Sequence, residues 1–128
     1  MIQTSRGHMN FDKFKALNAN PSRLGILSEY DAKGVFRNEG CGDDYEIFLK
    51  ISDNVIQDAR FKTTGCGFGL AALQLTLDCA VGRTIEEARD IPQEEIEAGI
   101  DGFPPARTHY IKDVKVALNN ALDQMSEV

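Results

Sequence analysis

Three places in the sequence carry side chains that bind metal ions or handle sulfur. They are Cys41 with Asp43, then Cys66, and finally His109. Cys66 stands between two glycines and directly before an apolar segment, so we expect its thiol where an extended segment ends and a helix begins. The N–H groups and dipole of a helix N-terminus favour negative charge, which biases a cysteine there toward the thiolate that binds metal or attacks sulfur. The alternative interpretation is a strand-to-helix turn that contains a small buried hydrophobe.

The four side chains together form one candidate site. Two thiolates, a carboxylate and an imidazole would complete a four-coordinate site for zinc or iron. Spacing alone gives this hypothesis little support, because the sequence contains no C-x-x-C pair. A histidine near a helix start is more often a surface or capping residue, and an aspartate after a glycine more often forms a turn. From the residues alone, both interpretations stay open.

An antiparallel hairpin is predicted to position the two cysteines. Residues 45–51 and 55–63 each alternate apolar and polar side chains, and turn-forming residues separate the two segments. The near end of this hairpin follows Cys41 and its far end leads to Cys66, so pairing of the strands brings both cysteines to one edge of the sheet. The apolar face of the second segment comprises Val55, Ala59 and Phe61.

Helices are predicted at both ends of the chain and in its middle. A short amphipathic helix opens near Asn10 and stops at residues 18–21. Residues 68–81 are apolar almost all round, which predicts a helix buried against the sheet and a second helix. Thr84 is a plausible cap for a further short helix. A long amphipathic helix follows the two adjacent prolines, with His109 in its first turn or just before it.

The remaining segments carry no predicted chemistry. Residues 20–42 are rich in loop-forming residues, with short strands expected at Ile26-Leu27 and Val35-Phe36. Cys79 lies roughly 20 Å from Cys66 along the helix axis, at about 1.5 Å per residue, so the two thiols cannot share a ligand site. We therefore expect Cys79 to be an ordinary core residue.

The composition indicates an ordinary soluble protein. Its 128 residues suit one domain over residues 9–128. Ser5-Arg6-Gly7-His8-Met9 resembles a cleavage scar, so residues 1–8 are expected to be a tag remnant or disordered. A formal charge of −6 argues against a nucleic-acid partner, and no apolar run reaches the roughly 20 residues of a membrane helix, so we expect a cytoplasmic protein. The three cysteines exclude a complete intrachain disulfide framework because their number is odd.

Several motifs occur in a recognisable order. They are Asn20-Pro21, Cys41-Gly42-Asp43, Phe61-Lys62-Thr63-Thr64-Gly65-Cys66-Gly67, Gly82-Arg83-Thr84-Ile85-Glu86-Glu87-Ala88 and Pro104-Pro105-Ala106-Arg107-Thr108-His109. From about residue 11 to residue 122, the chain resembles the iron–sulfur cluster assembly scaffold family, also called the IscU or NifU amino-terminal family. The resemblance implies an α+β fold in which a small antiparallel β-sheet of about three strands packs against helices. It also implies a scaffold on which a cysteine desulfurase deposits sulfur, iron is added and the nascent cluster passes to acceptor apoproteins.

The resemblance assigns roles to individual residues. Cys41, Cys66 and His109 match cluster or zinc ligands, and Asp43 matches the carboxylate associated with cluster lability and metal binding. The implied cofactor is a transient iron–sulfur cluster or a zinc or iron ion. Family members place a third cysteine directly after the histidine, whereas this sequence has Tyr110. A phenol, with a reference pKa of about 10 and a hard oxygen, cannot replace a soft thiolate or carry a persulfide.

Three functions follow as hypotheses. The first is a divergent scaffold or carrier, not an enzyme, that binds iron, a cluster or zinc through the four residues above. The second is a cluster-less adaptor that binds the desulfurase or acceptor proteins while Tyr110 plugs the site. The third is a sulfurtransferase that accepts sulfur on Cys66 as a persulfide. Residues 104–107 are similar to a segment that an Hsp70-type chaperone recognises in some relatives, so a chaperone is a further candidate partner, as is a second copy of the chain in a homo-oligomer.

Overall fold

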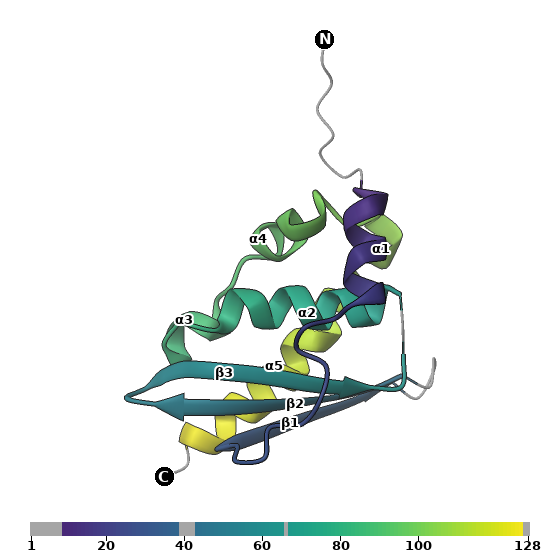
Figure 1. The fold of residues 1–128 in the computed structure, drawn as a ribbon. Helices are drawn as coiled ribbons and strands as arrows, with labels where there is room; N and C mark the ends of the chain where they lie inside the picture. The colour runs from purple at the N-terminus through teal and green to yellow at the C-terminus, as the bar shows by residue number, and fades with distance from the viewer. Residues whose placement is uncertain (1–8, 39–42, 66, 127–128) are drawn as a thin grey trace.

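The computed structural model describes residues 9–38, 43–65 and 67–126. The segment expected to be a tag remnant, residues 1–8, lies outside the described residues. Figure 1 shows the course of the chain. In chain order the elements are α1 (Phe11–Ala19), β1 (Ala32–Asn38), β2 (Asp43–Ser52), β3 (Val55–Thr63), α2 (Phe68–Ala80), α3 (Ile85–Arg89), α4 (Gln93–Glu97), the 3-10 helices η1 (Ala98–Ile100) and η2 (Pro105–Arg107), and α5 (His109–Ser126).

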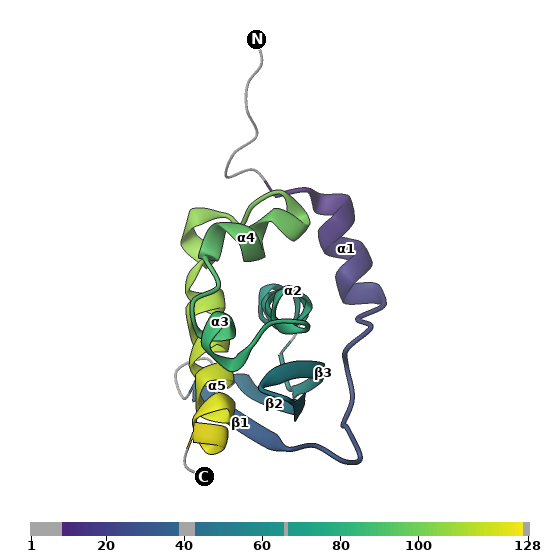
Figure 2. The same cartoon turned by 90° about the vertical axis from the view of Figure 1, so that its left-hand side faces the viewer.

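A three-stranded antiparallel sheet forms one side of the molecule. Its strand order is β1-β2-β3, and the register of the second pair places Tyr45 opposite Thr63 and Ile47 opposite Phe61. The helices lie on one face of this sheet. Figure 2 looks along α2, which runs through the centre with the sheet on one side and α1, α4 and α5 around it. The predicted α+β fold with a hairpin over residues 45–63 is confirmed.

The core lies between the sheet, α2 and α5. The side chains of Tyr45, Ile47 and Leu49 alternate along β2 and have no exposed surface, as the sequence pattern predicts. Helix α2 is buried along most of its length. Helix α5 contributes one stripe of buried side chains: Ile111, Val114, Ala117, Leu118, Ala121 and Leu122. Within the described part of the chain, no helix is both long enough and apolar enough to cross a membrane.

The buried face of β3 differs from the prediction at the start of the strand. Ile56 is fully buried, whereas Val55, predicted to face the core, is only partly buried. The β2–β3 register shifts between Lys50 and Ile51, and Gln57 is the residue that the register skips. Such a bulge inserts one residue into a strand, so the side chains on its two sides change faces relative to a regular alternation.

Loop segments cover the outer edge of β3. Near the end of the strand, the Gly25 N–H donates to the carbonyl oxygen of Phe61 at 2.8 Å, and the Phe61 N–H donates to the carbonyl oxygen of Arg23 at 2.9 Å. Near its start, the loop after α2 bonds to both backbone groups of Ile56. The backbone polar groups of this edge strand are thus satisfied at two separate points.

The segment before β1 keeps its predicted irregular course, with one correction. Ile26-Leu27 forms no strand, and the sheet-like contact in this segment is an isolated parallel bridge between Leu24 and Phe61. Two adjacent apolar residues without a longer alternation do not specify a strand register, so this prediction was wrong. Val35-Phe36 lies within β1, as expected.

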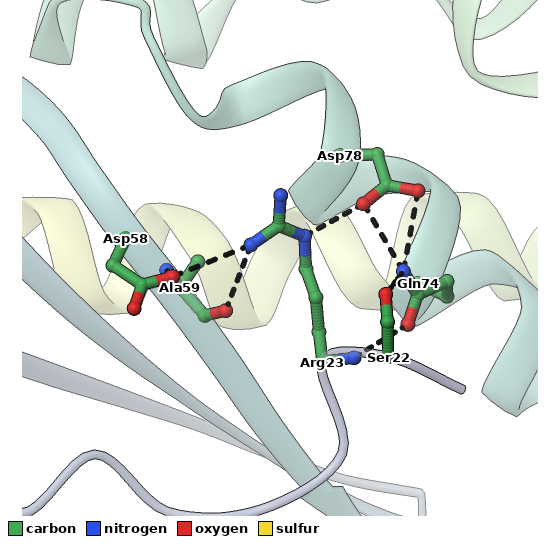
Figure 3. A network of polar contacts seen from close by, with 6 residues as sticks. All are labelled: Ser22, Arg23, Asp58, Ala59, Gln74 and Asp78. Carbon is green, nitrogen blue, oxygen red and sulfur yellow. Dashed lines mark hydrogen bonds and ion pairs between the residues drawn. The ribbon is translucent and has the colours of Figure 1, made fainter. Parts of the chain in front are cut away.

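A polar network fastens the same segment to α2 and β3. Figure 3 shows its six residues: Ser22, Arg23, Asp58, Ala59, Gln74 and Asp78. The Arg23 guanidinium donates from Nε to Asp78 Oδ1 at 2.6 Å and from Nη1 to the carbonyl oxygen of Ala59 at 3.2 Å. The buried Gln74 side chain accepts the Arg23 N–H at 3.0 Å and donates to Ser22 Oγ at 2.9 Å. These bonds explain why the apolar helix α2 carries two polar residues one turn apart.

Thr84 caps α3 as the sequence predicts, and its replacement provides a stability test. Its Oγ1 accepts the Glu87 N–H at 3.1 Å, and Glu87 Oε1 accepts the Thr84 N–H at 3.0 Å. Thr84→Ala should lower the free energy of unfolding by about 1 kcal/mol, because one N–H at the helix start loses its acceptor. Urea unfolding measures this change. Thr84→Ser, which keeps the hydroxyl, should lose much less, and equal losses for the two variants would contradict the capping role.

Candidate metal centre

The described end of the β2–β3 hairpin, at Asp44 and Thr64, is close in sequence to the predicted ligands Asp43 and Cys66. Here the Asp44 N–H donates to Thr64 Oγ1 at 3.1 Å, and the Thr64 N–H donates to the carbonyl oxygen of Asp44 at 3.3 Å. Beyond the strand, the Gly65 N–H donates to Thr63 Oγ1 at 3.0 Å. The backbone that leaves β3 therefore lies beside the beginning of β2, as the predicted hairpin requires.

The start of α5 packs against the first residue of α2. The ring centroid of Phe68 lies 6.2 Å from that of Tyr110 and 5.7 Å from that of Phe103. The Arg107 guanidinium lies 5.5 Å from the centroid of the same ring. Helix α2 begins shortly after the hairpin ends. The ring contacts of Phe68 therefore bring the start of α5 near the end of the hairpin. Figure 1 shows α2 leaving this end of the hairpin, at the tip of β3.

The structure describes the four predicted ligands only in part. Cys41 and Cys66 lie outside the described residues. Asp43 is the first residue of β2, and its side chain likewise lies outside the described part of the chain. His109 is the exposed first residue of α5, and its ring centroid lies 4.2 Å from that of Tyr110. Among the described residues, no group of three or more histidines, cysteines, aspartates and glutamates could hold a metal ion, so the four-residue site stays a prediction.

The turn into α2 depends on Gly67 and on a residue that the sequence pattern did not reveal. Gly67 is the N-cap of α2, with φ of 65° and ψ of −121°, a conformation that a side chain would make costly. Asn18 of α1 accepts the Gly67 N–H at Oδ1, at 2.7 Å, and donates from Nδ2 to the Gly67 carbonyl oxygen at 3.2 Å. The sequence suggested only a helix stop at Asn18. The usable signal was its position four residues after Phe14, which places a polar group on the apolar face of the helix.

Cys79 lies in the last turn of α2, apart from these residues. It is partly buried and packs against the core, in line with the prediction that it is a core residue. Burial raises the pKa of its thiol, the negative charge of Glu95 raises it further, and the neighbouring Arg83 acts in the opposite direction. Arg83 also pairs with the Glu95 carboxylate.

Alkylation of Cys79 should therefore reach half its maximal rate at a higher pH than alkylation of a thiol in an unstructured peptide. Peptide mass spectrometry after iodoacetamide treatment over a pH series measures this midpoint. Arg83→Gln should raise it further, because the opposing positive charge is removed. Since the pKa is higher in the folded state, the contribution of this thiol to stability is fully present below its unfolded pKa and is lost as pH rises through its folded pKa. If the alkylation rate of Cys79 reached half its maximum at or below the pH found for the peptide, the raised pKa of this thiol would be contradicted.

Nearly the whole sequence is similar to proteins of one kind. Residues 11–127 match the domain family described as the NifU-like N terminal domain. The chain is 33% identical over 112 residues to the iron-sulfur cluster assembly scaffold protein IscU 1 of Archaeoglobus fulgidus, a match that covers 88% of this chain and 71% of that protein. It is 32% identical over 94 residues to the iron-sulfur cluster assembly scaffold protein IscU of Escherichia coli K12, covering 70% of this chain and 73% of that protein.

Solved structures share the fold at lower sequence identity. The N-terminal part of a nitrogen-fixing NifU-like protein from Brucella abortus superposes with a TM-score of 0.73 at 22% identity, covering 90% of this chain and 92% of that one. A putative iron-sulfur cluster assembly scaffold protein for the SUF system from Fervidobacterium islandicum also gives a TM-score of 0.73, at 16% identity, covering 87% of this chain and 94% of that one. At these identities the superpositions establish the fold alone.

Proposed function

This chain belongs to the family of NifU-like N-terminal domains, and on that premise we propose that it is a scaffold or carrier in iron–sulfur cluster assembly. The observation that carries the proposal is the similarity, along 88% of the chain, to a relative named as an iron-sulfur cluster assembly scaffold protein. The protein would hold iron, a nascent cluster or zinc as cargo, without turnover chemistry of its own. Cysteine desulfurase would supply sulfur, and acceptor apoproteins would receive the cluster.

The proposed ligands are Cys41, Asp43, Cys66 and His109. Thiolates and imidazole suit zinc and iron, and a carboxylate adds a harder ligand that exchanges readily. Two contacts between described residues within two positions of Asp43, Cys66 and His109 support this set: the beginning of β2 is bonded to Thr64 beyond β3, and Tyr110 at the start of α5 packs on Phe68. With two thiolates per chain, a cluster would be held less firmly than by three.

Residues 104–107 support a candidate contact with a chaperone. Within this segment, Pro105–Arg107 forms an exposed 3-10 helix. Arg107 extends its guanidinium over the Phe68 ring, so a protein that bound this segment would contact the surroundings of the proposed site directly. Chaperone binding would in this way be coupled to release of the cargo.

Anaerobic reconstitution tests the proposed function. The wild-type chain is incubated with ferrous iron, cysteine and a cysteine desulfurase, and is then desalted. We expect visible charge-transfer absorption between sulfur and iron, or stoichiometric iron or zinc by metal analysis. The matched Cys41→Ser/Cys66→Ser variant should lose both signals. Neither absorption nor stoichiometric metal in the wild-type chain would overturn the proposal.

A cluster-less adaptor is the second candidate, and the packing of Tyr110 favours it. The phenol stands where the family resemblance implies a third thiolate, and its ring stacks with that of Phe68. An adaptor would bind desulfurase with equal affinity in the wild-type chain and in the Cys41→Ser/Cys66→Ser variant, whereas Arg107→Ala would weaken binding. Desulfurase binding together with a failed reconstitution would select this candidate.

A further inference from the structure

The protein's own loops and side chains already bond to three residues along the outer edge of β3. The backbone groups of Ile56 bond to the loop after α2, and those of Phe61 bond to the loop before β1. Between them, the Ala59 N–H donates to Asp58 Oδ1 at 2.8 Å. The Ala59 carbonyl oxygen accepts Nη1 of Arg23 at 3.2 Å (Figure 3). From Ile56 to Phe61 this edge is therefore occupied at each of these residues.

Thr63 is the next residue whose backbone faces this edge. Residues two apart in a strand direct their N–H and C=O groups to the same side, so Thr63 repeats the orientation of Phe61. Its neighbour Thr64 faces the other way and donates to the carbonyl oxygen of Asp44 in β2. The loop before β1 turns away at Gly25, where φ is 136°, and among the described residues it makes no backbone bond to β3 beyond this glycine. The backbone groups of Thr63 are therefore available to a further strand.

A mostly apolar groove of about 420 Å³ lies beside this residue. It is lined by Leu24, Gly25, Ile26, Lys62 and Thr63. Leu24 is 46% exposed and Ile26 is 56% exposed, so a partner that covered them would remove aliphatic surface from water. An open backbone edge next to such a groove has the features that strand addition by an extended peptide requires, because the backbone supplies hydrogen bonds and the groove receives a side chain.

The outer face of the sheet carries two positive charges beside this groove, those of Arg60 and Lys62. Carboxylates on this face pair with other cations: Asp44 with Arg37, Glu46 with Lys33, and Asp58 with Arg23. Within the described part of the chain, no carboxylate forms an ion pair with Arg60 or Lys62. Arg60 extends to the groove, since its Nη1 would lie 3.8 Å from a Cβ atom at Gly25. These two cations favour a partner that brings carboxylates to this place.

We propose that the end of β3 at Thr63 is a docking site for an extended acidic segment of a partner protein, which adds to the sheet as a short further strand. The side chains of a strand alternate between the two faces of a sheet, so every second side chain of the added segment reaches the face that carries Arg60 and Lys62. The matching segment therefore has carboxylates at alternate positions and aliphatic side chains between them. The inference does not depend on metal or cluster binding, because none of its residues belongs to the proposed ligands.

Binding of a synthetic peptide in which valine and glutamate alternate tests the proposal in the full chain, without any metal. Fluorescence anisotropy of the labelled peptide measures the affinity. Amide hydrogen exchange should show the Thr63 N–H becoming protected, whereas the Phe61 N–H, which is already bonded, should change little. Two further peptides are N-methylated at the valines alone or at the glutamates alone. One of them should fail to bind, because N-methylation at alternate residues blocks only one edge of an extended strand.

Two pairs of variants test the side chains of the groove. Lys62→Glu should weaken binding of the peptide about tenfold by reversing a charge, and Ile26→Ser should weaken it about tenfold by removing an aliphatic contact. Lys50→Glu is the matched control for the first, because it makes the same charge change at an exposed lysine on the same face. Val116→Ser is the control for the second, because Val116 is an exposed aliphatic residue on α5. Neither control should alter the affinity.

Four results would overturn the docking site. The first is no binding of the valine–glutamate peptide at millimolar concentration, and the second is equal binding of a peptide in which lysine replaces glutamate. The third is equal binding of both N-methylated peptides, which would show that the backbone is not paired. The fourth is a dimer of the chain that Ile26→Ser dissociates in sedimentation experiments, because a second copy rather than a partner protein would then occupy the groove.

Discussion

Gly34→Ala should destabilise the fold by about 3 kcal/mol, the upper end of the usual cost of overpacking a core. A Cβ atom at this position would lie 2.0 Å from the carbonyl oxygen of Ala117 and 2.6 Å from the backbone nitrogen of Ala121. Both are backbone atoms of α5, so the conflict cannot be relieved by rotating a side chain. Strand β1 and helix α5 would have to separate, and the free energy of unfolding in urea would record the loss.

Gly99→Ala is the matched control for this prediction. A Cβ atom at Gly99 would lie 2.2 Å from Cδ2 of Leu75, which is the end of a flexible side chain. Rotation of Leu75 relieves most of that conflict, so we expect a cost of about 1 kcal/mol. Equal losses in the free energy of unfolding for the two alanine variants would contradict the conclusion that backbone atoms of α5 make the steric conflict at Gly34 more costly.

Tyr110→Cys should increase the affinity for a thiophilic metal about tenfold, equivalent to 1.4 kcal/mol of binding free energy. The change places a thiolate next to His109, where the family resemblance implies a third cysteine, and soft ligands favour zinc, cobalt and iron–sulfur species. Competition of the variant against a chelator for cobalt(II) measures affinity. The lifetime of the charge-transfer absorption after anaerobic reconstitution measures how firmly a cluster is held.

The same substitution carries a structural cost, which Tyr110→Ser isolates. Tyr110 is partly buried, and its ring packs against those of Phe68 and His109. Truncating it should lower the free energy of unfolding by about 1–2 kcal/mol in both variants, less than for a fully buried aromatic residue. A higher metal affinity should appear in the cysteine variant alone. If the serine variant bound metal equally tightly, removal of a steric plug rather than addition of a ligand would explain the gain.

Periodic elements were predictable because their signal is local. The alternation in β2 and the apolar surface of α2 require no knowledge of the neighbouring elements, and both are buried as expected. The burial of Ile56 in place of Val55 was not predictable, because a bulge depends on the pairing of two strands. The hydrogen bonds from the loop before β1 to Phe61 join backbone groups, so no side-chain pattern in the sequence predicts them.

In the candidate site, too, local features were predictable from the sequence and tertiary contacts were not. Motif resemblance selected Cys41, Asp43, Cys66 and His109, and the glycine that follows Cys66 in the motif has a positive φ. Asn18 was missed because its partner becomes a neighbour only when α1 packs against the start of α2. A contact of this kind depends on tertiary structure, and a single sequence carries no periodic signal for it.

The loops along the outer side of β3 occupy part of an edge strand that could otherwise pair with another chain. An unpaired border strand is a template on which another polypeptide can add a strand, and repeated addition leads to fibrils. Here the backbone of Phe61 is already engaged by the loop before β1, and that of Ile56 by the loop after α2. These two contacts therefore leave less of the β3 border available for strand addition by further copies.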